Sequence, residues 1–132
     1  MITIKDRWEL LALHRALFEA KLHSAPEDRD IVGSPVLARL AERVVDELIA
    51  AETREGDANS KTRWGTWRRA SEHPQRVNYL RAALQAQKNW AGYDELSRRT
   101  FLIDALAPLV AEEYEIQQLL KEADAFHKQK AR

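Results

Sequence analysis

Hydrophobic positions recur with a helical period of three to four residues in successive segments of the chain. Between residues 3 and 23 they cover a wide arc of the helical wheel rather than one narrow stripe. The apolar residues of this arc are Ile4, Trp8, Leu10, Leu11, Leu13, Leu17, Phe18 and Leu22. We therefore expect a first helix that contacts two other helices. Residues 23–33 hold Pro26, Gly33 and a run of charged residues, which predicts a loop.

The second segment begins with a clear helix-start signal. Ser34 is a favourable N-cap residue, and Pro35 suits the first helical position, where its missing N–H removes no hydrogen bond. One compact stripe follows, made of Leu37, Leu40, Ala41, Val44, Val45, Leu48 and Ala51. This helix should end near Glu55, because Gly56 comes next.

Prolines and glycines divide the rest of the chain. A short third helix is expected over residues 60–71, weakened by Gly65. Proline inside a helix removes a hydrogen bond and clashes with the preceding turn. We therefore predict a break at His73 and a new helix from Pro74 to about Trp90.

The last helical segment is predicted from Glu95 to about Lys128. Gly92 ends the helix before it, and Asp94 can cap its start. Pro108 lies inside the segment and should kink it or split it.

These patterns place the chain in the all-α class. No segment alternates hydrophobic and polar residues as a half-buried strand does. The 132 residues fit a single domain, residues 1–132. Short connections favour antiparallel neighbours. The sequence therefore predicts an antiparallel four- or five-helix bundle with a break at His73–Pro74 and a kink near Pro108.

Composition excludes several classes of protein. Basic and acidic side chains number 21 each, so the net charge is zero, which argues against a uniformly basic nucleic-acid binder. Cysteine is absent, which excludes disulfides, thiolate zinc sites and a cysteine nucleophile. The most apolar window, residues 101–111, is too short to cross a membrane, and no secretory hydrophobic run follows the N-terminus. We expect a cytoplasmic protein that does not contact membranes.

The neutral total hides one strongly basic segment. Residues 58–92 contain seven basic side chains and one acidic one, whereas residues 31–57 contain three basic and six acidic. The candidate interaction or polyanion-binding surface consists of Lys61, Arg63, Trp64, Trp67, Arg68, Arg69, Arg76 and Arg81. Arginine binds phosphate and indole rings stack on unpaired bases, so nucleic acid is one candidate ligand. Alternatively, the basic segment lies against the acidic second helix and its tryptophans are core or interface anchors.

Aromatic residues suggest association with protein. Trp90 and Tyr93 flank a turn, so we expect part of their surface to be accessible. Exposed aromatic rings beside arginines are typical of interface hot spots. Zero net charge removes the repulsion that keeps monomers apart, and a homodimer is the commonest oligomer.

His14 marks a second candidate site, a pocket for a small ligand. It projects near the centre of the apolar arc of the first helix, on one line with Arg7 and Lys21. Polar groups within a buried arc must find partners or face a cleft. Candidate acids for His14 are Glu112, Glu113 and Glu115. A satisfied interior histidine is the simpler interpretation.

Metal and catalytic patterns are missing from the sequence. Glu19 and His23, and Asp124 and His127, have carboxylate–imidazole spacing but form no repeated Glu-x-x-His motif. No nucleophile–base pattern is present, so we predict no catalytic residues, no metal and no cofactor.

Three functions remain as hypotheses. The first is a non-enzymatic bundle that binds protein, either a second copy or another partner, through residues 61–93. The second is a nucleic-acid-binding module that uses the basic segment 61–81. The third is an enzyme or ligand-binding protein with a pocket around His14.

Overall fold

The computed structural model describes residues 1–23 and 30–131, and these residues contain no strand. The all-α prediction is confirmed. Six α-helices and two short 3-10 helices follow one another as α1 (Arg7–Lys21), α2 (Pro35–Arg54), α3 (Ser60–Trp67), η1 (Ala70–Glu72), α4 (Pro74–Gln85), η2 (Trp90–Gly92), α5 (Glu95–Leu106) and α6 (Glu113–Lys130). Most of the loop predicted over residues 23–33 lies outside the described residues.

Side-chain caps fix the starts of several helices. The predicted caps are confirmed: Ser34 Oγ accepts from the Leu37 N–H at 3.2 Å, and Asp94 Oδ1 accepts from the Ser97 N–H at 2.7 Å. Asp6 caps α1 in the same way, which is why this helix begins at Arg7 and not at residue 3. Each cap satisfies an N–H group that the first helical turn leaves without a partner.

The short third helix ends earlier than the sequence indicates. It was expected to reach residue 71, but α3 ends at Trp67 because the following backbone binds a distant loop. The Val110 N–H donates to the Arg68 carbonyl at 2.7 Å, and the Ala70 N–H donates to the Val110 carbonyl at 2.9 Å. These two bonds connect the chain after α3 to the chain after α5.

Pro108 splits the last predicted helix into two, which is the second of the two outcomes expected from the sequence, and the kink is not found. The residue before a proline disfavours helical geometry, and Ala107 accordingly has extended dihedral angles at the end of α5. The Ala107–Pro108 peptide bond is cis. The expected helix over residues 95–128 is therefore divided into α5 and α6, and the described chain has six α-helices where four or five were predicted.

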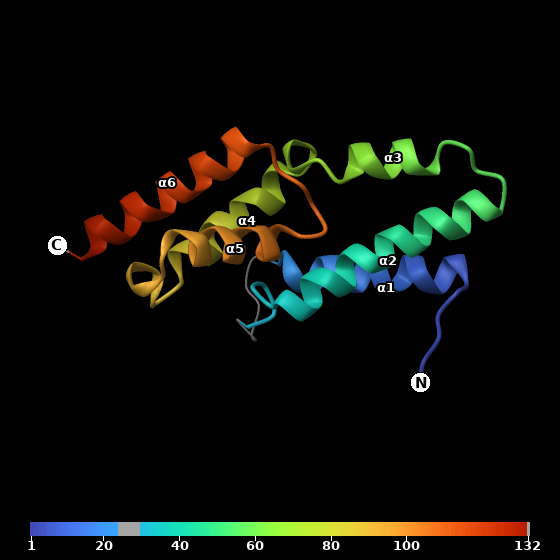
Figure 1. Ribbon diagram of the computed structural model, residues 1–132, viewed down its shortest axis with the longest axis horizontal. Helices are drawn as coiled ribbons and strands as arrows, with labels where there is room; N and C mark the ends of the chain where they lie inside the picture. The colour runs from blue at the N-terminus through green and yellow to red at the C-terminus, as the bar shows by residue number, and fades with distance from the viewer. Residues whose placement is uncertain (24–29, 132) are drawn as a thin grey trace.

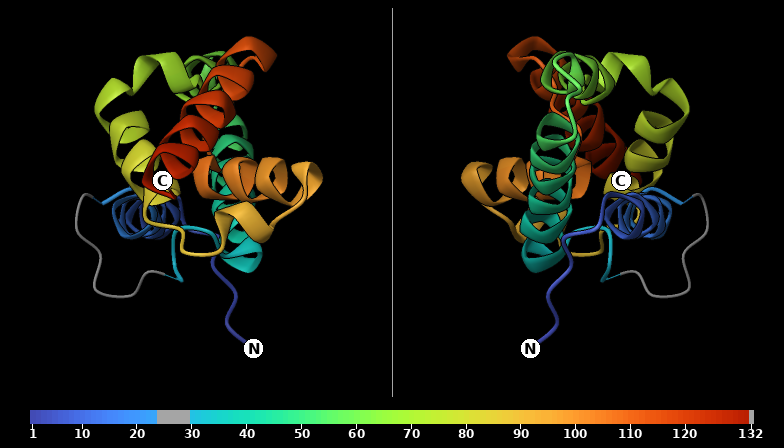
Figure 2. Two further views of the ribbon diagram at one scale, coloured as in Figure 1. Left: turned by 90° about the vertical axis from the view of Figure 1, so that its left-hand side faces the viewer. Right: turned by 90° about the vertical axis from the view of Figure 1, so that its right-hand side faces the viewer.

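The helices form two groups along an elongated molecule. Helices α1 and α2 run antiparallel along the long axis, and α3 folds back over α2 (Figure 1). Helices α4, α5 and α6 gather at the end of the molecule that lies away from α3. The end views show α3 above α2, with α5 beside α2 (Figure 2). The buried hydrophobic residues accordingly form two clusters.

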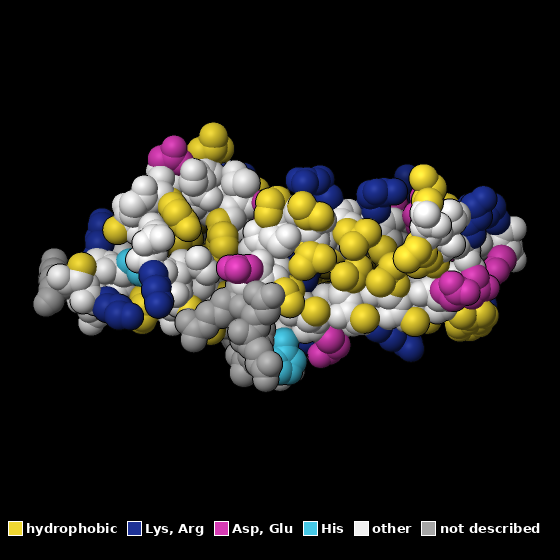
Figure 3. Space-filling view, turned by 90° about the horizontal axis from the view of Figure 1, so that it is seen from below, with side chains coloured by type: hydrophobic (Ala, Val, Ile, Leu, Met, Phe, Trp, Pro, Cys, Tyr) yellow, Lys and Arg dark blue, Asp and Glu magenta, His cyan; other side chains and the backbone are white. Residues whose placement is uncertain are grey.

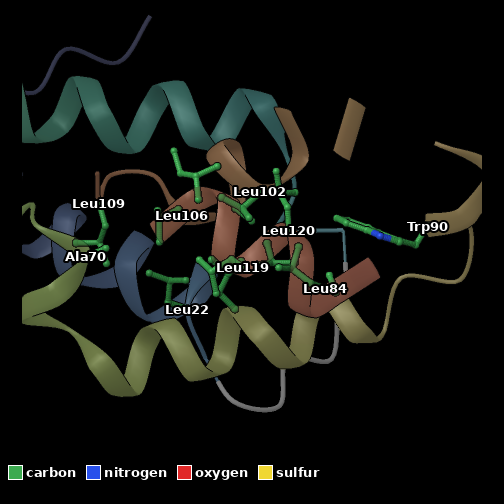
Figure 4. Close-up of a cluster of buried hydrophobic side chains, with 14 residues drawn as sticks. Leu22, Ala70, Leu84, Trp90, Leu102, Leu106, Leu109, Leu119 and Leu120 are labelled. Atoms are coloured by element: carbon green, nitrogen blue, oxygen red, sulfur yellow. The ribbon is translucent and has the colours of Figure 1, made fainter. Parts of the chain in front are cut away.

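The larger cluster lies among α4, α5 and α6 (Figure 4). Leu80 and Leu102 are fully buried in it, and Leu22 and Val32 reach it from the α1 and α2 ends. The smaller cluster lies between α1 and α2 and has four buried members, which are Leu10, Val44, Leu48 and Ala51. Half-buried side chains, including Leu13, Leu17 and Trp64, complete it.

Candidate functional site

The two candidate sites of the sequence meet in one aromatic cluster. The ring of His14 on α1 lies 5.1 Å from the ring of Trp64 and 4.7 Å from that of Trp67, both on α3 and both edge-on. Phe18 packs against Trp67 at 5.0 Å, and His73 packs against Trp67 at the same distance. Nothing in the sequence joins residue 14 to residues 64–73. The pairing requires α3 to fold back over α1 and α2.

The His14 ring is neutral inside this cluster. Only 6% of the residue is exposed, and burial lowers the pKa of its imidazole from 6.5 to about 4. The positive charges of Arg15 and Arg68 lower the pKa further. His14 therefore packs as an aromatic side chain at neutral pH, in the interior position that the sequence favoured.

The acids considered as partners for His14 have other roles. Glu113 pairs with Arg99 across the two helices that Pro108 separates, at 2.6 Å between Oε2 and Nη2. Glu112 and Glu115 form a capping box at the start of α6. The proposed pairing of His14 with these three glutamates is not found.

The other two members of the polar line on α1 contact partners other than His14. Arg7 Nη1 forms an ion pair with Glu55 after the end of α2, at 3.0 Å, while its Nε is buried and has no hydrogen-bond partner among the described residues. Lys21 is 1% exposed, and its Nζ donates to the carbonyls of Asp104 and Ala107 at 2.6 Å each. Burial lowers the pKa of this ammonium from 10.5 to about 8. Lys21 thus caps the C-terminal end of α5.

Most of the basic segment is neutralised within the fold. Arg63 pairs with Asp57 at 2.8 Å and with Glu52 at 3.3 Å. Arg68 pairs with Asp46 at 2.9 Å, also on α2. This is the alternative in which the basic segment lies against the acidic second helix.

The next two arginines of the segment bind acids of other helices. Arg76 pairs with Glu19 on α1 and donates to the Leu22 carbonyl at 2.8 Å. Arg81 pairs with Glu122 on α6 at 2.9 Å. Lys61 and Arg69 are exposed, and neither forms an ion pair with a residue in the described ranges.

Two tryptophans of residues 61–93, Trp64 and Trp90, donate hydrogen bonds to carboxylates. The Trp64 Nε1–H donates to Glu52 Oε1 at 2.6 Å, and Ser60 Oγ donates to the same oxygen at 2.9 Å. Part of the surface of Trp90 and Tyr93 was expected to be accessible, and this holds for the half-buried Tyr93 but not for Trp90, which is 1% exposed. Its Nε1–H donates to Asp124 Oδ1 at 2.7 Å. A buried indole needs such an acceptor, and α6 supplies it here.

A pocket of about 440 Å³ opens elsewhere on the molecule. Its walls come from the residues before α2, from the connection between α4 and η2, and from α5. Phe101 and Tyr93 supply aromatic walls, and Lys88 and Asn89 supply polar groups. No residue of α1 or α3 lines this pocket, so it is distinct from the pocket expected around His14.

An apolar surface lies on the side of α1 and α2 opposite α3. We call it the α1–α2 face, and it consists of Ala12, Leu13, Ala16, Ala20, Val36 and Leu40. Helical spacing places the three alanines on the side of α1 that points away from His14. Val36 is 64% exposed and Leu40 is 37% exposed. The view from below shows hydrophobic side chains gathered along this half of the molecule (Figure 3).

Sequence reasoning missed this face as a candidate site. Leu40 belongs to the stripe that the sequence predicts to be buried, yet only the rest of that stripe is covered by α1 and α5. Small alanine side chains gave no signal because they suit both exposed and buried helix positions.

Comparisons with protein-family models, with curated proteins and with solved structures returned no match. Within the described ranges, no helix combines the length and apolar character needed to cross a membrane. In the same residues, no three side chains of the metal-binding types converge on one point.

Proposed function

We propose that the protein acts by binding another protein through the α1–α2 face. The observation that supports this proposal is the exposed apolar surface formed by two adjacent helices. Apolar area removed from water contributes about 25 cal/mol per Å², so covering Leu40, Val36 and their neighbours is favourable. Contiguous apolar surface on a folded protein marks an interaction site more often than scattered residues do.

The construction of the smaller cluster gives further support. Only one side of the α1–α2 pair is covered by α3, so the opposite side leaves Leu13 half-buried. A partner that packs there would complete a second layer, as helices do in four-helix bundles. The proposed function therefore requires no rearrangement of the fold.

The α1–α2 face replaces residues 61–93 as the proposed binding surface. Four of the six basic side chains in the sequence-based candidate surface are occupied by carboxylates of the same chain. Trp64 and Trp67 pack against His14, so their ring faces are not arranged as stacking platforms. These contacts favour protein binding through the apolar face over nucleic-acid binding through the basic segment.

Site-directed photo-crosslinking tests this proposal. A photoreactive residue is placed at Leu40 or, as the matched control, at Leu96, an exposed leucine on α5. We expect a discrete crosslinked product in cells from position 40 and none from position 96. The product should disappear when Ala16→Glu places a charge on the face. A product that Ala16→Glu leaves unchanged, or no product at position 40, would contradict the proposal.

A further inference from the structure

We infer that the partner is a second copy of this chain, docked with the two α2 helices antiparallel across the α1–α2 face. This inference rests on the proposed function and specifies its partner. It is carried by two charged residues at the edge of the face, Arg43 and Glu47. They lie one helical turn apart on the same exposed side of α2 as Leu40.

Some charged residues of the α2 segment are paired within the fold and others are not. Asp46, Glu52 and Glu55 each pair with an arginine. No ion pair joins Arg43 or Glu47 to any residue in the described ranges, although both are exposed, and the same holds for Arg39, Glu42 and Arg54. Helical spacing places Arg43 and Glu47 near the middle of α2 on the side that carries Leu40. The fold therefore leaves one positive and one negative side chain available beside its apolar face.

Two-fold symmetry makes this pair self-complementary. When a helix packs antiparallel against its own copy, positions on either side of the crossing point face each other. A crossing centred at residue 45 places Arg43 of one protomer opposite Glu47 of the other, and Glu47 opposite Arg43. A parallel arrangement would instead place arginine opposite arginine. Charge therefore selects the antiparallel docking.

Side-chain sizes fit the same arrangement. The crossing that pairs Arg43 with Glu47 also places Leu40 opposite Ala50, so a large side chain meets a small one. On α1, which runs antiparallel to α2, the Arg7–Glu55 ion pair sets the register and puts the small side chain of Ala16 near the level of residue 45. Small residues at a crossing allow helix axes to approach to about 8 Å.

The available area fits a reversible dimer. A 20-residue helix such as α2 is about 30 Å long, and two adjacent helices present a face about 20 Å wide. Docking would bury about 500–600 Å² per protomer, which is at the lower limit of stable protein interfaces. We therefore expect a dimer that dissociates on dilution.

Charge reversal with sedimentation velocity tests this arrangement. Arg43→Glu places glutamate opposite glutamate at both symmetric positions, and Glu47→Arg places arginine opposite arginine. Each variant should weaken the dimer about tenfold or more. The double variant R43E/E47R should dimerise like the parent chain. An equimolar mixture of the two single variants should form a heterodimer, because their charges are then complementary.

Controls separate the interface from folding. Lys121→Glu reverses an exposed charge on α6 and should leave the dimer intact. Circular dichroism and thermal melting should show that both reversed chains stay folded, since positions 43 and 47 are exposed.

The remaining outcomes overturn the inference in distinguishable ways. A wild-type chain that stays monomeric at every accessible concentration overturns self-association. A dimer that neither single variant weakens overturns the docking arrangement. If the chain is monomeric but position 40 crosslinks to a different protein, the proposed function stands and the inferred partner is wrong. If position 40 crosslinks to nothing, both fail.

Discussion

The two halves of the molecule differ in how completely their helices cover one another's apolar side chains. Around α4, α5 and α6, the helices cover one another and bury fourteen residues in one cluster (Figure 4). In the smaller cluster between α1 and α2, four buried residues pack together, and half-buried side chains such as Leu13 and Leu17 complete it. The α1–α2 face is the side of this helix pair that α3 leaves uncovered.

In the smaller half, aromatic rings supply much of the packing. His14, Phe18, Trp64 and Trp67 fill the space between α1 and α3 that aliphatic side chains fill in the larger half. Large rings bury much area per residue, so a short helix such as α3 can be anchored by two of them. Aliphatic side chains therefore dominate the packing at one end of the molecule and aromatic rings dominate it at the other.

The largest expected difference between the halves comes from truncating one leucine in each. Leu102 is fully buried among α4, α5 and α6, so Leu102→Ala should lower the free energy of unfolding by about 3–4 kcal/mol through the cavity it leaves. Leu17 is half-buried between α1 and α2, and Leu17→Ala should lower it by about 1 kcal/mol. Urea denaturation measures both. Equal losses would show that the halves are packed equally tightly.

Lys21 on α1 donates hydrogen bonds to backbone carbonyls at the end of α5, so its titration tests the contact between the two halves. Its pKa is about 8 in the folded protein and 10.5 when unfolded, so between these values the unfolded chain binds more protons. Unfolding free energy should therefore rise between pH 8 and pH 10.5, by up to about 3 kcal/mol. Lys21→Met should lack this rise and should also be less stable at pH 7, because two α5 carbonyls lose their donor.

The comparison of Lys21→Met with the parent chain isolates this effect. Other groups titrate in the same range, and they contribute equally to both proteins. Chemical denaturation at several pH values gives the difference between the two stability curves. A constant difference from pH 7 to pH 10.5 would mean that Lys21 keeps an ordinary pKa in the folded state.

His14 gives a comparable effect on the acid side. Its pKa is about 4 when folded and 6.5 when unfolded, so protons bind the unfolded chain first as the pH falls. The stability linked to His14 is complete above pH 6.5 and is lost as the pH falls to 4, by up to about 3 kcal/mol. His14→Phe keeps an aromatic ring and should remove this loss, as acid denaturation can measure. If His14→Phe lost as much stability in acid as the parent chain does, the titrating group responsible would be a residue other than His14.

Local signals predicted the elements of this fold well. Ser34 and Asp94 cap the helices that the sequence assigned to them, and Pro74 begins a helix as expected. The helix ends were predicted less well where the backbone makes long-range contacts. The Arg68 and Ala70 bonds to Val110 end α3 early, and no property of residues 60–71 indicates that partner.

The candidate site was predicted only as separate parts. The sequence singled out His14, Trp64 and Trp67, but it did not show that they touch one another. It indicated that helix 2 is acidic and residues 58–92 are basic, but not which charges pair. Arg43 and Glu47 could not be recognised, because their significance lies in the partners that they lack.

The sequence by itself determined which segments are helical, where several of them start and which positions are apolar. Those properties depend on interactions within a few residues, such as caps, proline geometry and the 3.6-residue period. Only the tertiary structure decided which apolar positions are covered and which charges are neutralised. Coverage of Leu40 depends on where α1, α3 and α5 lie around α2, and contacts between residues far apart in the chain set that arrangement.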